Sequence, residues 1–275
     1  MNLESIESSP GVSIHVRSLV PPAPRATVVI CHGVNSHSGQ YGWAIEQLSA
    51  AGFATYALDL RGRGMSSGPR YVVHDVDDYA ADVRATIALA KSRHPGLSVF
   101  LLGHSAGGVT SCIYTLDHQP EIAGLICESF AFAVYAPPGA LSIVKLIAKI
   151  APNLPVLKLP MKNFTRDPAA LQLLLDDPLT KNESQPAVTV AALVRGTERL
   201  RKEFPRITLP VFILHGSADK ATKPAGSQLF YDTAGAKDKT LRLYDGHAHD
   251  LLNDIGKEKV LANIVEWIDA RLPKA

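Results

Sequence analysis

The chain has 275 residues, with 28 Lys and Arg against 26 Asp and Glu and 46% hydrophobic residues. This balanced charge, without blocks of one sign, argues against a nucleic-acid partner, and the apolar content excludes a disordered chain. The length suits one large α/β domain with a sizeable core. No run approaches the roughly 18 consecutive apolar residues of a membrane span.

The three cysteines, Cys31, Cys112 and Cys127, each lie in or beside an apolar run. This placement favours buried free thiols over a disulfide or a metal site. The first ten residues contain neither the basic region nor the apolar region of a signal peptide. These features predict a soluble cytoplasmic protein, and the sequence leaves its oligomeric state open.

Short apolar runs rich in branched residues alternate with helical stretches along most of the chain. The runs begin at Thr27, Phe53, Leu97, Ile122 and Pro210. The helical stretches cover residues 41–51, 75–93, 106–118, 224–234 and 258–271. This alternation predicts an α/β fold, a mostly parallel, doubly wound sheet of about eight strands with both faces covered. Segments 3–8 and 12–17 are predicted to be antiparallel strands at one edge.

The alternation stops between Phe130 and Phe204, where prolines recur and no buried strand is recognisable. We expect residues 131–205 to form a helical cap inserted within a single domain of residues 1–275. A helix over residues 141–151 is amphipathic, with Leu141, Val144, Ile147 and Ala151 on one face and Ser142, Lys145 and Lys149 on the other.

The segment Gly103–Gly107, with the sequence GHSAG, follows an apolar run and precedes a helical one. At a tight strand-to-helix turn, small neighbours allow a serine hydroxyl to stand clear of the sheet, which favours Ser105 as a nucleophile. A second match to the same pattern surrounds Ser66, but no strand precedes it and Pro69 follows it. Ser66 is therefore expected to be a loop residue.

A serine nucleophile needs a histidine base and a carboxylate that orients the histidine, in the chain order serine, acid, histidine. Asp219 follows the apolar run that begins at Pro210 and is the preferred acid, with Glu128 as the alternative. His247 and His249 both lie in the turn before the last helical stretch, and their spacing does not separate them.

The oxyanion of a tetrahedral intermediate needs two backbone N–H donors. Ala106, directly after the nucleophile, is expected to supply one. Gly33 allows the turn after the first core strand to approach Ser105, so the N–H of Val34 is expected to supply the other. His32 is interpreted as a hydrogen-bonded anchor of this turn.

With these residues in place, the chain resembles the α/β-hydrolases of the monoacylglycerol lipase and lysophospholipase-like group, of the serine aminopeptidase S33 type. The matching segments are HGVNSHSGQY, LDLRGRGMSSGPR, GHSAGG, LPVFILHGSADKAT and LYDGHAHDLLND. In this family the catalytic histidine precedes an acidic residue and two apolar ones, so the resemblance implies a triad of Ser105, Asp219 and His249. Asn35 and Ser36 depart from the glycine and glutamate common in the family, which affects the detail of the oxyanion turn.

The resemblance implies an α/β-hydrolase fold and a serine carboxylic-ester hydrolase that cleaves acyl esters such as monoacylglycerols through an acyl-enzyme, without a metal or an organic cofactor. A lysophospholipase, a hydrolase of short polyesters or aromatic esters and a serine peptidase are the alternatives. A binding protein that has lost catalysis is the alternative of another class. We expect Leu141, Val144 and Ile147 to contact substrate. Eleven Lys or Arg against six Asp or Glu in residues 134–206 could suit transient contact of the cap with a lipid interface, but a solvated surface is the favoured explanation because the basic residues are scattered.

Overall fold

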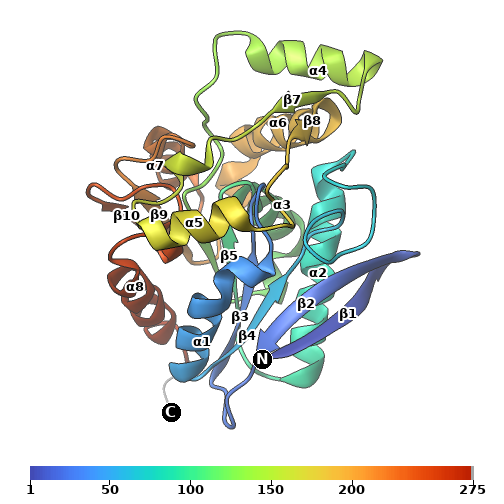
Figure 1. Ribbon diagram of the computed structural model, residues 1–275. Helices are drawn as coiled ribbons and strands as arrows, with labels where there is room; N and C mark the ends of the chain where they lie inside the picture. The colour runs from blue at the N-terminus through green and yellow to red at the C-terminus, as the bar shows by residue number, and fades with distance from the viewer. Residues whose placement is uncertain (274–275) are drawn as a thin grey trace.

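The computed structural model describes residues 1–273, in which an eight-stranded sheet lies between two layers of helices (Figure 1). Across the sheet the strands are β1 (Asn2–Ser9), β2 (Val12–Leu19), β4 (Phe53–Leu58), β3 (Ala26–Cys31), β5 (Val99–His104), β6 (Gly124–Glu128), β9 (Val211–Gly216) and β10 (Lys239–Tyr244). β1 and β2 pair antiparallel, β2 also runs antiparallel to β4, and the other strands are parallel. The predicted α/β sheet with an antiparallel edge is confirmed.

Two hydrophobic cores, one on each face of the sheet, hold the helices in place. Along β3, Val28 and Ile30 pack under α1 (Gly42–Ala50) and α8 (Lys257–Asp269), whereas Val29 and Cys31 belong to the opposite core. That core contains α2 (Val76–Arg93), α3 (Ala106–His118) and α7 (Pro224–Thr233). Strands buried on both faces explain the continuous apolar runs. β10 had no such run because it is an edge strand in which only Tyr244 is buried.

The segment between β6 and β9, residues 129–210, leaves the sheet and folds above the carboxyl ends of the strands (Figure 1). It contains α4 (Ala140–Ile150), β7 (Pro155–Leu157), α5 (Pro168–Asp176), β8 (Gln185–Pro186) and α6 (Ala187–Glu203). The short β7–β8 ribbon was not expected from the sequence. Two short 3-10 helices, Met161–Asn163 and Phe204–Arg206, also lie in this segment. Others elsewhere in the chain cover Ser38–Tyr41, Gln119–Glu121 and Leu251–Asn253. α6 joins this β6–β9 segment to the main core through Ala192 and Leu200.

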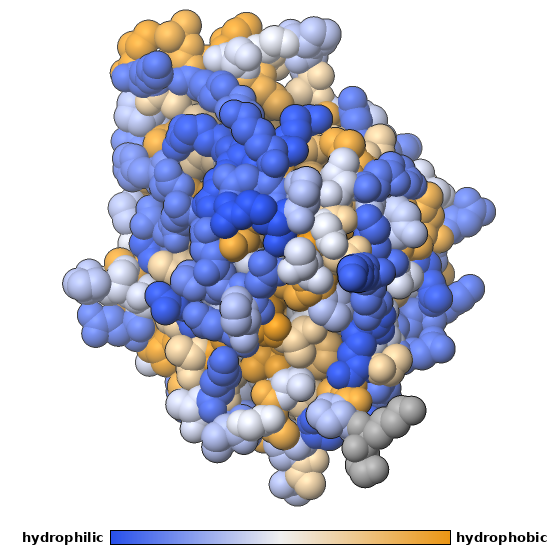
Figure 2. All heavy atoms as spheres, turned by 180° about the vertical axis from the view of Figure 1, so that it is seen from behind, coloured by the Kyte–Doolittle hydropathy of each residue, from blue (hydrophilic) through white to orange (hydrophobic). Residues whose placement is uncertain are grey.

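α4 is poorly covered by protein. None of its residues is buried, and Ile143, Leu146 and Ile150 are 58%, 59% and 79% exposed. Hydrophobic side chains are visible at the top of the molecule, where this helix lies (Figure 2). The amphipathic pattern expected from the sequence was therefore incomplete, because this helix carries a second, outward row of apolar residues. Within residues 1–273, no helix combines the length and the apolar character needed to cross a membrane.

Candidate active site

Ser105 lies in a strained turn between β5 and α3. Its φ of 55° falls in the left-handed region, which costs a residue with a side chain about 1–3 kcal/mol and is typical of functional sites. A Cβ on Gly103 would lie 2.5 Å from Oγ of Ser111, and one on Gly107 would lie 2.3 Å from the carbonyl oxygen of Cys31. Only glycine fits at these two positions, as expected for a tight strand-to-helix turn.

Asp219 and His249 meet at the carboxyl edge of the sheet, in the loops that follow β9 and β10. Nδ1 of His249 lies 2.7 Å from Oδ2 of Asp219, and both side chains are almost fully buried. The other ring nitrogen, Nε2, has no hydrogen-bond partner within residues 1–273. His247 instead lies near Asp254, at 3.7 Å. Of the two candidate histidines, the structure brings His249 to the carboxylate.

The carboxylate of Asp219 is held in its ionised form by several donors. The N–H groups of Ala221 and Thr222 donate to Oδ1 at 2.7 and 2.9 Å, and the Thr222 hydroxyl donates to Oδ2 at 2.7 Å. Burial acts to raise the pKa of Asp219, but the hydrogen bonds from His215 and His249 outweigh it and lower the pKa. An ionised carboxylate can orient an imidazole and stabilise its protonated form.

Thr222 and His215 were missed in the sequence. Aspartates in turns commonly accept backbone N–H groups of the residues that follow, which predicts a turn after Asp219 but does not single out Thr222. His215 lies within a buried strand and carries no comparable local signal.

The loop after β3 touches the turn that carries Ser105. A Cβ on Gly33 would lie 2.9 Å from Cβ of Ser105, so only glycine permits this approach. Val34, Ala106 and His249 line the same pocket as Ser105. The N–H groups of Val34 and Ala106 have no acceptor within the described part of the chain. Two free donors beside a serine hydroxyl can stabilise an oxyanion.

His32 and Ser66 have the loop positions expected from the sequence. Nδ1 of His32 lies 2.6 Å from the carbonyl oxygen of Gly33, and Nε2 accepts the N–H of Leu60 at 3.0 Å. Burial lowers the pKa of His32 to about 4, so the ring is neutral and anchors the loop. The Ser66 hydroxyl donates to the carbonyl oxygen of Asp59 at 2.6 Å and lies in an irregular loop.

A mainly apolar pocket of about 310 Å³ lies above Ser105, and residues of the β6–β9 segment line much of it. Leu141 and Val144 of α4 line it as expected, whereas Ile147 is not among the lining residues. Gln185, which is fully buried, contributes a polar side chain from β8. Val34, Ala106, Thr222 and His249 also line this pocket.

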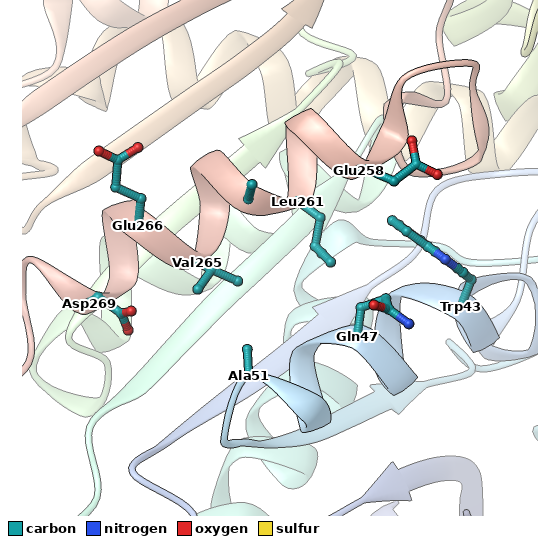
Figure 3. Close-up of a pocket in the computed structure, with 9 residues that line it drawn as sticks. Trp43, Gln47, Ala51, Glu258, Leu261, Val265, Glu266 and Asp269 are labelled. Carbon is teal, nitrogen blue, oxygen red and sulfur yellow. The ribbon is translucent and has the colours of Figure 1, made fainter.

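A second, shallower groove lies between α1 and α8 (Figure 3). Trp43 and Gln47 project from one helix toward Leu261 and Val265 of the other, with Glu258 at one end. The residues that line it include no serine, cysteine or histidine. It therefore offers no serine or cysteine nucleophile and no histidine base, and the pocket above Ser105 is the candidate active site.

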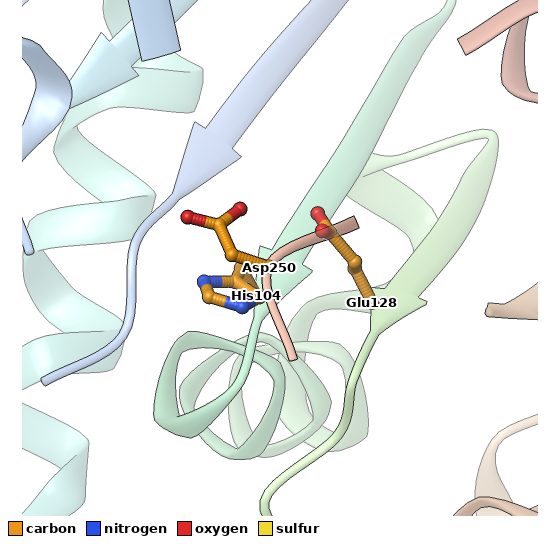
Figure 4. A group of neighbouring side chains, drawn as sticks. All are labelled: His104, Glu128 and Asp250. Carbon is orange, nitrogen blue, oxygen red and sulfur yellow. The ribbon is translucent and has the colours of Figure 1, made fainter. Parts of the chain in front are cut away.

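His104, Glu128 and Asp250 form a buried group next to this site (Figure 4). Each offers one potential ligand atom, and these atoms lie within 4.8 Å of one another. Burial, reinforced by the charge of Asp250, raises the pKa of Glu128 well above its usual value, and burial raises the pKa of Asp250 to about 6. The group can coordinate a small cation, but the raised pKa values favour a protonated carboxyl at Glu128.

Glu128, the alternative acid, does not take the place of Asp219. Its Oε1 accepts the N–H of Leu252 at 3.2 Å, and no hydrogen bond within residues 1–273 joins it to His249. The carboxylate that orients the histidine is therefore the one from the loop after β9.

The family model for the serine aminopeptidase S33 proteins matches residues 22–256. The chain belongs to this family. The monoacylglycerol lipase of Mycolicibacterium smegmatis is 30% identical over 251 residues, which cover 90% of each chain. The caffeoylshikimate esterase of Arabidopsis thaliana is 29% identical over 292 residues, which cover 99% of this chain and 87% of that protein.

Among solved structures, the monoacylglycerol lipase of Paleococcus ferrophilus matches with a TM-score of 0.85 and 31% identity, covering 94% of this chain and 99% of that one. The family and the fold implied by the sequence are thereby confirmed. This member of the S33 family is an α/β-hydrolase and a serine hydrolase of carboxylic esters.

Proposed function

We propose that the protein hydrolyses monoacylglycerols with a catalytic triad of Ser105, Asp219 and His249. The observation that carries this proposal is the 2.7 Å contact between Asp219 and Nδ1 of His249, which leaves Nε2 without a partner in a pocket that Ser105 also lines. An imidazole fixed in this tautomer has its free nitrogen available to accept a proton. Relatives named as monoacylglycerol lipases support the choice of ester.

In the proposed mechanism, Oγ of Ser105 attacks the ester carbonyl while Nε2 of His249 accepts the hydroxyl proton. Asp219 stabilises the imidazolium that results. His249 then donates this proton to the leaving glycerol oxygen, which leaves an acyl group on Ser105. Water attacks the acyl-enzyme with His249 as base, and the fatty acid leaves.

We further propose that the N–H groups of Val34 and Ala106 form the oxyanion hole. Both flank Ser105 and have no acceptor within the described residues, so neither must give up a hydrogen bond when the oxyanion develops. Such preorganised donors are each worth roughly 3–4 kcal/mol of transition-state stabilisation.

We propose that residues 131–205 act as a cap that selects the substrate. Leu141 and Val144 contribute to an apolar pocket, which suits an acyl chain. The exposed row of Ile143, Leu146 and Ile150 would contact the lipid surface in which monoacylglycerols reside. The three buried free cysteines support a cytoplasmic location.

A fluorophosphonate probe, which phosphonylates activated serines, tests the triad. We expect labelling of the unmodified chain and none of Ser105→Ala, with a fall of roughly a million-fold in kcat. Absence of labelling in folded, unmodified protein would instead favour a binding protein.

A panel of monoacylglycerols, a lysophospholipid, an aromatic ester and a soluble polyester tests the substrate class. The highest kcat/KM on a monoacylglycerol is expected, and a higher value on another ester would refute the substrate assignment.

A further inference from the structure

The loop that carries Val34 is held by a carboxylate from the β6–β9 segment. The next residue, Asn35, has a φ of 56°, in the left-handed region that residues with a side chain rarely adopt. Its N–H donates a 2.8 Å hydrogen bond to Oε1 of Glu183, and both residues are almost fully buried. This contact joins the proposed oxyanion loop to a residue 148 positions later in the chain.

Glu183 is itself held by buried neighbours. Arg63, which is 1% exposed, donates to Glu183 through Nη1, to Oε1 of Gln185 at 2.8 Å through Nη2, and to the Tyr79 hydroxyl at 3.1 Å through Nε. Nε2 of Gln185 donates to the same Oε1 of Glu183 at 2.5 Å. The other carboxylate oxygen, Oε2, has no partner within residues 1–273. All of the contacts that fix Glu183 therefore converge on the oxygen that accepts from Asn35.

We propose that Glu183 is a positioning residue for the oxyanion hole, an inference that rests on the function proposed above. Its carboxylate takes the N–H of Asn35, which fixes the loop and leaves the N–H of Val34 unpaired beside Ser105. A negative charge near a developing oxyanion would oppose catalysis, and here the guanidinium of Arg63 balances it.

A second contact between the same two regions provides a matched control. Oδ2 of Asp177 accepts from Nε2 of His37 at 2.7 Å and from Nε2 of Gln40 at 2.9 Å. Neither donor is next to Val34 in the chain. Loss of this carboxylate loosens the same attachment without releasing the N–H of Asn35.

The test compares Glu183→Gln with Glu183→Met. Both variants remove the charge and leave Arg63 without its ion pair, so they share that cost in stability. They differ in that Gln still offers Oε1 to the N–H of Asn35, with its amide nitrogen at the place of the unpaired oxygen. We expect kcat on a short soluble ester to be about thirtyfold to a hundredfold lower in the Met variant than in the Gln variant, at similar KM.

A double variant, Arg63→Met with Glu183→Leu, covers the case in which the single variants do not fold. Replacement of a buried ion pair by apolar residues is often neutral or stabilising, so we expect it to remain folded. Its kcat should fall about a hundredfold, because the N–H of Asn35 loses its acceptor.

An alkylboronic acid reports on the oxyanion hole itself, because it forms a tetrahedral adduct with an activated serine. We expect its affinity to fall by the same factor as kcat in Glu183→Met and in the double variant. An ether analogue of the ester, which resembles the ground state, should keep its affinity. In Asp177→Leu, which removes the acceptor for His37 and Gln40, kcat and boronate affinity should stay within about twofold of the unmodified chain.

Equal kcat in folded Glu183→Gln and Glu183→Met overturns the proposal, as does a loss in Asp177→Leu as large as that in Glu183→Met. A folded double variant with full kcat and boronate affinity also overturns it. Fluorophosphonate labelling separates these results from failure of the proposed function. A chain that is not labelled at Ser105 lacks the hydrolase site, whereas a labelled chain whose kcat is independent of Glu183 lacks only the positioning role.

Discussion

Two parts of the β6–β9 segment meet the same pocket in opposite ways. Around Glu183 and Gln185 the side chains are buried and hydrogen-bonded to loops of the sheet. Along α4 no residue is buried, and Ile143 and Ile150 are more than half exposed. The difference matches the two proposed roles. Groups that hold an oxyanion hole must be fixed in place before the reaction, whereas apolar residues that contact lipid become buried only when the lipid is bound.

This comparison predicts that changes at the hydrogen-bonded end act on kcat and that changes on α4 act on the use of lipid substrates. Variants at the two ends of the segment and at the triad separate these two effects.

Asp219→Asn is expected to have the largest effect, a fall of about 10⁴-fold in kcat, because an amide no longer fixes the productive tautomer of His249 or stabilises its charge. Steady-state kinetics on a soluble ester measures it. His247→Ala is the matched control, since this histidine lies near Asp254 rather than Asp219, and it should retain most of the activity. A large loss in His247→Ala with a small one in Asp219→Asn would show that the base has been assigned to the wrong histidine.

Replacing Ile143, Leu146 and Ile150 together by serine should lower kcat/KM on vesicles that contain monoacylglycerol by about thirtyfold or more, because even partial burial of the three side chains in lipid would contribute about 2 kcal/mol in total. The activity on a soluble short-chain ester should not change. Leu173→Ser is the control, since this leucine is 75% exposed but lies on α5. An equal loss on both kinds of substrate would mean that the triple variant disturbs the active site and not the lipid contact.

Val144→Phe should narrow the pocket and reduce kcat/KM for long-chain esters about tenfold more than for an acetyl ester, the usual range for a small change in an apolar pocket. Ile147→Phe, one turn away on α4 but outside the lining, should leave the chain-length profile unchanged. A series of p-nitrophenyl esters measures both. A changed chain-length profile in Ile147→Phe but not in Val144→Phe would instead support the prediction from sequence that Ile147 contacts substrate.

Local patterns made much of the sheet and the chemically important residues predictable. The turn around Ser105 was predictable because glycine is sterically required at Gly103 and Gly107. Asp219 was predictable because it follows a continuous apolar strand. The assignment of the triad itself stays a prediction until Ser105 is tested. β10 gave only a weak signal, because an edge strand with one buried residue has no apolar run.

Contacts between distant parts of the chain were not predictable. Nothing near Asn35 indicates that its N–H meets Glu183, since the two lie far apart in sequence and no periodic pattern relates them. The outward face of α4 was missed for a different reason. An amphipathic helix is expected to bury its apolar residues against protein, but this one has apolar residues on two sides, and Leu146 faces solvent.

The smallest expected effect concerns the buried carboxyls behind the active site. Because the pKa of Glu128 is raised in the folded chain, the native state keeps a proton that the unfolded chain loses above pH of about 4.3. The contribution of Glu128 to the free energy of unfolding should therefore decrease, by about 1.4 kcal/mol per pH unit, as pH rises from there toward the pKa of the folded state. In Glu128→Gln an amide N–H donor takes the place of that proton at every pH, so this pH-dependent decrease in stability is absent.

The Tm of Glu128→Gln minus that of the unmodified chain should accordingly increase as pH rises from 5 to 8. The kcat of the variant on a soluble ester should change little. Glu46→Gln, at an exposed carboxyl on α1, should show no such divergence and serves as the control. A Tm difference that is constant with pH would mean that Glu128 is ionised in the native state. In that case the neighbouring Asp250 and His104 must accommodate a second charge, and the cation that their geometry can coordinate becomes the better explanation of the group.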